Sequence, residues 1–159
     1  MPTIRFRPKR AWLLPIYAAL LGTLYLLVYT PIIADYHYLK HKRAFNAGKL
    51  EEAQKHIQKA ILLDPHNTTF LFYAAQELGA VKGMRLLEDS IRFYNGDIVP
   101  WAQWHSHGVF MLQRGQVMDA RESLQKALWY NPEYTRARKK LAEVDKLIEE
   151  NDRVMIRFR

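Results

Sequence analysis

The chain has 159 residues, enough for one ordinary domain, and its lack of cysteine excludes disulfide frameworks and thiolate metal sites. Its formal net charge of +8 comes from 24 Lys and Arg against 16 Asp and Glu. Four of the basic residues lie in the first ten positions, which leaves 20 against the same 16 acids in the rest of the chain. That balance is too even for a protein that follows nucleic-acid phosphates.

A long apolar segment follows the basic tail formed by residues 1–10. Residues 11–33 carry no charge over 23 positions, and a bilayer-spanning helix needs about 20. Trp12 and Tyr29 suit the two membrane interfaces, while Pro15 and Pro31 lie near the ends, where a missing backbone donor costs least. A cleaved signal peptide is the alternative, but its apolar core is shorter, about 7–15 residues. We predict a retained transmembrane helix.

The flanking residues indicate an orientation for this helix. The tail 1–10 has basic side chains and no acidic ones, and positively charged flanks stay on the cytoplasmic side. We therefore predict a cytoplasmic N-terminus, with the rest of the chain in the periplasm if the membrane is a bacterial inner membrane; an organelle is the alternative. Ala18 and Gly22, four positions apart, would let a second transmembrane helix approach closely.

An internal repeat occupies residues 34–134. The segments 44–67 and 112–134 align at an offset of 67 residues. Glycine, alanine and proline recur in this alignment as Gly48 and Gly115, Ala53 and Ala120, Ala60 and Ala127, Pro65 and Pro132. Between them, Gly83 and Pro100 repeat the same glycine-to-proline spacing of 17 positions. The pattern predicts three units of about 34 residues each.

These units resemble the tetratricopeptide repeat family, which has a large residue, a small one four positions later, a turn glycine, two small residues seven apart and a closing proline. The third unit has all of them: Trp104, Gly108, Gly115, Ala120, Ala127 and Pro132. The first unit departs in its first half, where His37 and His41 take the large and small positions, and the middle unit has Glu88 and Asn95 where small residues belong. The resemblance covers about 100 residues and implies two helices per unit, with Gly83 at the middle turn.

The amino acids agree with helical hairpins and a capping helix. Ala53, Ile57, Ala60 and Ile61 form an apolar stripe on one helix face. Asp64–Pro65 stops that helix, and Asn67 is placed to cap the next. Further on, Leu141, Val144, Leu147 and Ile148 give a seventh, capping helix one apolar face. The predicted fold is therefore all-α: a transmembrane helix followed by a short tetratricopeptide-like solenoid over residues 34–150.

The last segment, residues 151–159, has a different pattern. The tripeptide Glu150-Asn151-Asp152 at its start is a typical helix stop. After it, Val154, Ile156 and Phe158 alternate with polar or flexible side chains. This alternation is typical of a half-buried strand. We predict a tail that docks onto a partner by adding a strand to an exposed sheet edge.

Residues 101–132 concentrate tryptophan and histidine, which raises the question of a ligand site. Trp104 occupies a repeat position and is expected in the core, and Trp129 is expected to cover Trp101. His105 and His107 are two apart, so on a helix they point about 200° apart and do not chelate one metal. The sequence also has no phosphate loop, HExxH or nucleophile motif. We expect no cofactor, no metal and no catalytic activity.

The resemblance implies a concave groove lined by the first helix of each pair. By register, its residues are Tyr38, Lys42, Phe45, Phe72, Gln76, His105, Val109, Leu112, Arg136 and Lys139. Aromatic and basic side chains suit a peptide with apolar anchors and some acidic character. We predict a membrane scaffold, assembly factor or accessory subunit that binds other subunits and the lipid bilayer, but no nucleic acid and no small-molecule substrate. The alternative is a regulatory or substrate-presenting subunit of a membrane enzyme, such as one handling polysaccharide or glycosylation.

Overall fold

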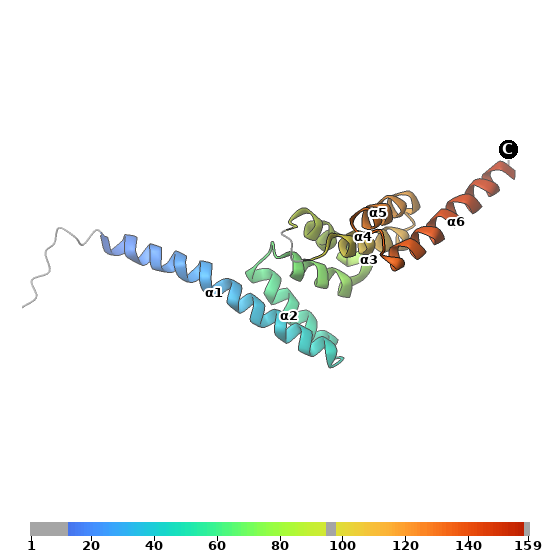
Figure 1. Ribbon diagram of the computed structural model, residues 1–159. Coiled ribbons are helices and arrows are strands. Elements are labelled where there is room, and N and C mark those ends of the chain that lie inside the picture. The colour runs from blue at the N-terminus through green and yellow to red at the C-terminus, as the bar shows by residue number, and fades with distance from the viewer. Residues whose placement is uncertain (1–12, 95–97, 158–159) are drawn as a thin grey trace, which may run out of the picture.

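The structure is a computed structural model that describes residues 13–94 and 98–157. The predicted basic tail 1–10 and Trp12 lie outside the described residues. All secondary structure in the described part is helical, which confirms the predicted all-α class. The helices are α1 (Leu13–Asn46), α2 (Leu50–Leu63), α3 (Thr68–Arg92), α4 (Pro100–Gln113), α5 (Val117–Tyr130) and α6 (Thr135–Arg157), shown in Figure 1.

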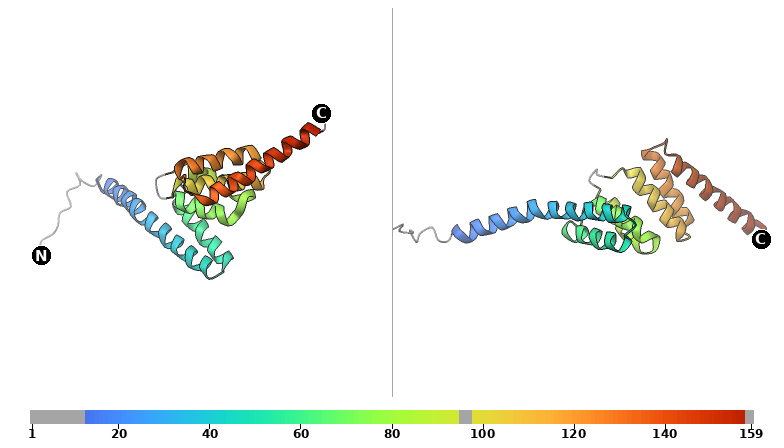
Figure 2. Two further views of the ribbon diagram at one scale, coloured as in Figure 1. Left: turned by 45° about the vertical axis from the view of Figure 1, so that its right-hand side comes forward. Right: turned by 90° about the horizontal axis from the view of Figure 1, so that it is seen from below.

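The helices form a stack of hairpins with a long arm at one end. The second half of α1 pairs with α2, α4 pairs with α5, and α3 contacts α4 between them. The right-hand view of Figure 2 shows α6 as the outermost helix, and in both views its C-terminal end projects away from the α1 arm. Because α3 bends at Gly79, the described part has seven helical segments, as the repeat pattern predicts.

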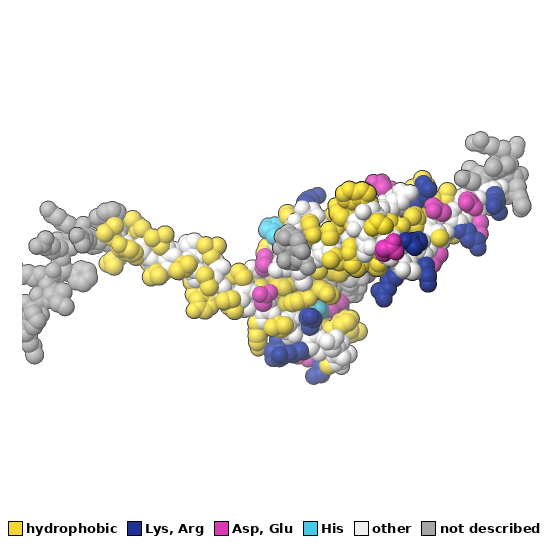
Figure 3. All heavy atoms as spheres, viewed as in Figure 1, with side chains coloured by type: hydrophobic (Ala, Val, Ile, Leu, Met, Phe, Trp, Pro, Cys, Tyr) yellow, Lys and Arg dark blue, Asp and Glu magenta, His cyan; other side chains and the backbone are white. Residues whose placement is uncertain are grey.

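Helix α1 joins the apolar segment to the first repeat without a break. We expected an end near Pro31, but this proline lies inside the helix. A proline inside a helix removes its own backbone donor and crowds the carbonyl four residues earlier, but prolines occur inside transmembrane helices, where local adjustments satisfy the freed groups. From Leu14 to Tyr29 the side chains are exposed, and Figure 3 shows this arm covered by hydrophobic side chains with hardly any charge.

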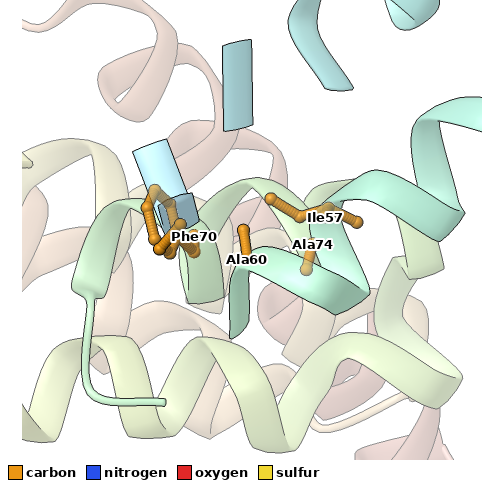
Figure 4. Close-up of a cluster of buried hydrophobic side chains, with 5 residues drawn as sticks. Ile57, Ala60, Phe70 and Ala74 are labelled. Carbon is orange, nitrogen blue, oxygen red and sulfur yellow. The ribbon is translucent and has the colours of Figure 1, made fainter. Parts of the chain in front are cut away.

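The first core forms where α1, α2 and α3 meet. Ala34, Ile57, Ala60, Phe70 and Ala74 are each at most 3 % exposed and pack together, and Figure 4 shows Phe70 and Ile57 on either side of the alanines. The alanines let the helices approach closely, while the two larger side chains fill the remaining space. The predicted stripe on α2 therefore faces the core.

Turn glycines separate the two helices of each unit. Gly48 and Gly115 have φ of +74° and +76°, as predicted for the turns of the first and third units. The middle turn is at Gly79, with φ +68°, so its prediction at Gly83 was wrong. Gly83 instead lies within a helix at the crossing of the two segments of α3, where a Cβ would run into the backbone of Ala75.

The N-terminal cap of α3 is the residue that the sequence predicts. The backbone N–H of Phe70 donates to the Asn67 side chain at 3.3 Å, so Asn67 is the N-cap of this helix. Helix α2 ends at Leu63, directly before Asp64–Pro65. Both boundaries are set by local chemistry, because an unsatisfied helix end needs an acceptor and a proline restricts the residue before it.

Helix α6 closes the stack and extends beyond it. Ala137 and Val144 are fully buried against Leu124 and the alanines of α5, which confirms the predicted capping face. The helix runs on to Arg157, so the predicted stop at residues 150–152 and the strand that follows were wrong. Asparagine and aspartate are poor helix formers but not breakers, and the Glu149–Arg153 pair at 3.9 Å supports the continuing turn.

Candidate partner-binding groove

The first half of the groove is a hollow of about 480 Å³ where α1, α2 and α3 meet. Its lining combines aromatic, aliphatic and polar side chains: His41, Lys42, Phe45, Asn46, Leu50, Gln54, Tyr73, Gln76 and Glu77. Phe45 is 48 % exposed and Leu50 59 % exposed, so this half offers apolar surface that a bound segment would cover.

The second half is a hollow of about 370 Å³ between α3 and α4, closed by the start of α6. Its lining residues are Phe72, Gln76, Trp101, Ala102, His105, Ser106, Val109, Phe110, Tyr134 and Arg136. Gln76 lines both hollows. The two hollows therefore adjoin at Gln76, and we call them together the groove.

A buried acid and a buried histidine meet at the floor of the first hollow. The Nδ1 atom of His41 lies 3.3 Å from Glu77 Oε1 and 3.3 Å from the carbonyl oxygen of Ala53. The Glu77 side chain is only 10 % exposed, and its second oxygen, Oε2, has no hydrogen-bond partner. Burial raises the pKa of Glu77, and His41 partly offsets that rise. The Oε2 atom has almost no accessible surface, so Glu77 is an unsatisfied acid of the interior behind the wall of the hollow.

The second hollow has positive charge at its end. Arg136 is exposed and lines the hollow beside His105, whose ring lies 5.1 Å from that of Tyr134. Burial lowers the pKa of His105, and the charges of Arg136 and Lys140 lower it further. A neutral imidazole next to a guanidinium suits an acidic or carbonyl group of a partner, because both donate hydrogen bonds to oxygen.

His107, two residues from His105, has different neighbours. Ser123 Oγ donates to the Asp119 carbonyl at 2.8 Å and lies 2.8 Å from His107 Nδ1. Since the hydroxyl hydrogen is already used, Nδ1–H of His107 is the donor to Ser123. Within residues 13–94 and 98–157, no group of three or more His, Asp or Glu side chains is placed to hold a metal ion.

The structure distributes the ten predicted groove residues over four environments. Lys42, Phe45 and Gln76 line the first hollow, and Phe72, Gln76, His105, Val109 and Arg136 line the second. Tyr38 and Leu112 pack against the cores instead, and Lys139 is exposed on α6 outside both hollows. Register alone missed Tyr73 and Glu77; the signal available was His41, a large side chain at a small-residue position.

The tryptophans show which aromatic side chains belong to the core. Trp104 packs against the core shared by α5 and α6, as predicted, and Lys126 Nζ lies 4.6 Å from its ring centroid. Trp101 packs on Tyr134 with ring centroids 4.4 Å apart. We expected Trp129 to cover Trp101, and this prediction was wrong. Trp129 is 76 % exposed and contacts Tyr130.

The close approach of a second transmembrane helix at Ala18 and Gly22 stays a prediction. Ala18 and Gly22 are exposed, and a Cβ added at Gly22 would meet nothing within 4 Å. By length and composition, α1 is the one described helix able to cross a membrane, and its most apolar stretch is 0 % buried.

Comparison with known proteins defines the fold of this stack. The sequence matches no protein-family model and no curated protein sequence. Among solved structures, the first tetratricopeptide domain of Spaghetti (RPAP3), bound to an HSP90 peptide, gives a TM-score of 0.68 at 15 % identity, covering 75 % of this chain and 95 % of that one. The chain has a tetratricopeptide-like fold.

Two further structures agree with this fold. The tetratricopeptide domain of Arabidopsis OM64 gives a TM-score of 0.66 at 14 % identity, covering 74 % of this chain and 98 % of that chain. The MamA protein gives 0.67 at 18 % identity, covering 76 % and 66 %. Short peptides occupy some domains of this fold: SRMEEVD on the Spaghetti domain and SGPTIEEVD on the second human RPAP3 domain.

Proposed function

We propose that this chain is a non-catalytic, single-pass membrane protein that binds a segment of a partner protein in its groove. It would act as a scaffold, assembly factor or accessory subunit of a membrane complex. The observation that carries this proposal is α1 itself: one unbroken helix is wholly exposed and apolar over its first half and forms the first repeat over its second half.

The same continuity favours a retained anchor over a cleaved signal sequence. Cleavage after the apolar stretch would cut inside a helix, next to Ala34, which is fully buried in the first core. With the basic tail on the cytoplasmic side, the repeat domain lies in the periplasm of a bacterial inner membrane.

The groove indicates the chemistry of the bound segment. Phe45, Leu50 and Tyr73 give the first hollow apolar surface. Arg136 at the other end suits an acidic side chain or a backbone carbonyl. A short segment with an apolar anchor and an acidic group beyond it meets both requirements.

Copurification of groove variants tests this function. The full chain, extracted in detergent, should bring down partner subunits, and Phe45→Ala combined with Arg136→Ala should reduce that yield severalfold. Lys82→Ala and Met118→Ala, exposed on the second helices of their units, are the matched controls and should retain it. Equal loss in the groove double variant and both controls, or no effect of the groove double variant, would contradict binding in the groove.

The composition of the recovered complex distinguishes a scaffold or assembly factor from a dedicated subunit of a membrane enzyme. A scaffold or assembly factor should copurify with several proteins. A regulatory or substrate-presenting subunit should copurify with one catalytic chain in fixed ratio, and that result would replace the scaffold reading.

A further inference from the structure

One edge of the repeat stack carries most of its exposed aromatic side chains. We call it the connection edge: the ends of α2, α3 and α5 and the described residues that link each to the next helix, Asp64–Asn67, Phe93, Tyr94, Val99 and Asn131–Tyr134. Of the seven exposed Trp, Tyr and Phe residues from residue 34 onward in the described part, four lie here: Phe93, Tyr94, Trp129 and Tyr130. Of the other three, Phe45 and Tyr73 line the groove and Tyr36 lies on α1.

The three connections are continuous in space. The ring of His66, in the first connection, lies 4.4 Å from that of Phe93 in the second. Trp101, which follows the second connection, lies 4.4 Å from Tyr134 in the third. The aromatic side chains therefore belong to one continuous edge of the stack.

This edge lies on the side of the stack from which the apolar half of α1 leaves. Figure 1 shows α2 running back along α1 toward that half, and Ala34 packs with Ala60 near the end of α2. Residues 13–33 of α1 span roughly 30 Å at about 1.5 Å per residue, which matches the hydrocarbon thickness of a bilayer. A membrane around them would end beside Ala34, at the level of the connection edge.

The opposite edge provides an internal comparison. It contains the turns at Gly48, Gly79 and Gly115, and its exposed apolar side chains are Leu50, Val81 and Met118, together with Phe45 in the last turn of α1. Exposed apolar surface therefore occurs at both edges, but the connection edge has four exposed aromatic side chains and the opposite edge has one. Tryptophan and tyrosine are the side chains that favour the headgroup region, because one end of the ring is apolar and the other forms hydrogen bonds.

We propose that the connection edge is a second membrane contact, with Phe93, Tyr94, Trp129 and Tyr130 resting in the lipid headgroup region. A modest tilt of α1, of the order of 20° as transmembrane helices adopt, brings the third unit toward the surface. The repeat domain then lies on the bilayer with a fixed orientation of its groove. This inference rests on the proposed anchoring of α1.

Spin labels on single cysteines test the contact, since the native chain has none. The full chain is reconstituted in vesicles of phosphatidylcholine and phosphatidylglycerol, with labels at Arg92→Cys and Glu133→Cys on the connection edge. Arg114→Cys on the opposite edge is the charge-matched control for Arg92, and Leu24→Cys reports on the α1 span. We expect severalfold higher collision with oxygen relative to a water-soluble nickel chelate at Arg92 and Glu133 than at Arg114.

A second variant checks the aromatic side chains themselves. Trp129→Ser with Tyr130→Ser should return the label at Glu133 to the value of the Arg114 control. The proposal is overturned if the labels at Arg92 and Glu133 match the control in the unaltered background. It is also overturned if they lose chelate collisions without gaining oxygen collisions, because that result indicates contact with a second copy. A water-exposed label at Leu24 would overturn the anchoring of α1 as well. A lipid-exposed label at Leu24, with labels at Arg92 and Glu133 that match the control, would overturn only the second membrane contact and leave the proposed function standing.

Discussion

At the scale of single residues, Gly83 and Gly108 each lie where one helix of a pair crosses the other. A Cβ at Gly83 would overlap the backbone of Ala75, whereas a Cβ at Gly108 would lie 2.8 Å from Leu124 Cγ and 3.1 Å from the Ala120 carbonyl oxygen. The overlap at Gly83 is the closer one and involves backbone alone, so only a separation of the helices relieves it, whereas the nearest atom at Gly108 belongs to a side chain. The two glycines are therefore not equally replaceable.

We expect Gly83→Ala to lower the free energy of unfolding by about 1–3 kcal/mol, the usual cost of overpacking. Gly108→Ala should stay within about 1 kcal/mol of the wild type, because the gain in helix propensity offsets the adjustment of Leu124. Urea unfolding of both variants, followed by circular dichroism, measures the difference. An equal cost for the two variants would contradict the backbone overlap at Gly83.

His107 makes stability depend on pH in a defined direction. Burial lowers its pKa, and nearby carboxylates such as Glu88 only partly oppose this. The unfolded chain therefore takes up the proton more readily than the folded one, so the stability present above the ordinary pKa of about 6.5 is lost as the pH falls below it. His107→Gln retains a donor for Ser123 and cannot titrate.

Between pH 7.5 and pH 5.5, the wild type should consequently lose more stability than His107→Gln. Urea unfolding at both pH values gives the comparison, and His66→Gln, at an exposed position, serves as the control. Identical pH dependence of the wild type and His107→Gln would show that His107 remains free to take up a proton in the folded state.

At the scale of whole helices, α6 combines a docked half with a projecting half. Val144 is fully buried against α5, whereas Leu147, one turn further on, is 42 % exposed. The Arg121 Nε to Asp145 Oδ1 contact of 2.7 Å ties the same region of α6 to α5, although a half-exposed ion pair contributes little. The attachment of α6 therefore depends on buried apolar side chains.

Val144→Ala should lower the free energy of unfolding by about 1–3 kcal/mol, because it leaves a cavity between α5 and α6. Leu147→Ala on the same helix should cost less than about 0.5 kcal/mol, as expected for a surface change. Thermal unfolding of the two variants and the wild type provides the measurement. If Val144→Ala unfolds like the wild type, α6 is not held by this core.

The helices also show what the sequence alone could predict. The hairpins α1–α2 and α4–α5 were predictable because glycine, alanine and proline recur there at fixed distances. The middle turn was misplaced because Gly83 keeps the expected spacing to Pro100 while Gly79, four residues earlier, adopts the left-handed conformation. The end of α6 was misread because Asn151 and Asp152 often end helices but do not prevent a helix from continuing.

The groove was only partly predictable for a related reason. Repeat register identifies which helices line it, so Phe45, Phe72 and Val109 follow from the sequence. Glu77 does not, because its importance comes from a contact with His41 across two helices, 36 positions away in the sequence. Pairing between distant helices depends on how each unit is rotated on the last, which the repeat spacing does not specify.

At the scale of the whole molecule, the arrangement of the α1 arm fixes where the groove can act. Figure 1 shows the arm leaving on the side where α2 ends. In the proposed arrangement this arm spans the membrane, which holds the repeat domain and its groove close to the bilayer. A partner that reaches it needs a segment near the membrane surface on the same side. This geometry suits the juxtamembrane parts of other membrane proteins better than a freely diffusing ligand.

Sidedness is the last expected outcome, and single cysteines make it measurable. With the basic tail in the cytoplasm and the repeats outside it, Lys82→Cys, on the exposed turn edge, should react with a membrane-impermeant thiol reagent once the outer barrier is permeable. Thr3→Cys should react only after the inner membrane is disrupted, because the positive-inside rule holds the tail in the cytoplasm. The wild type, which has no cysteine, gives the background. Labelling of Thr3→Cys before Lys82→Cys would reverse the orientation and place the groove in the cytoplasm, while the packing of the repeat stack would be unchanged.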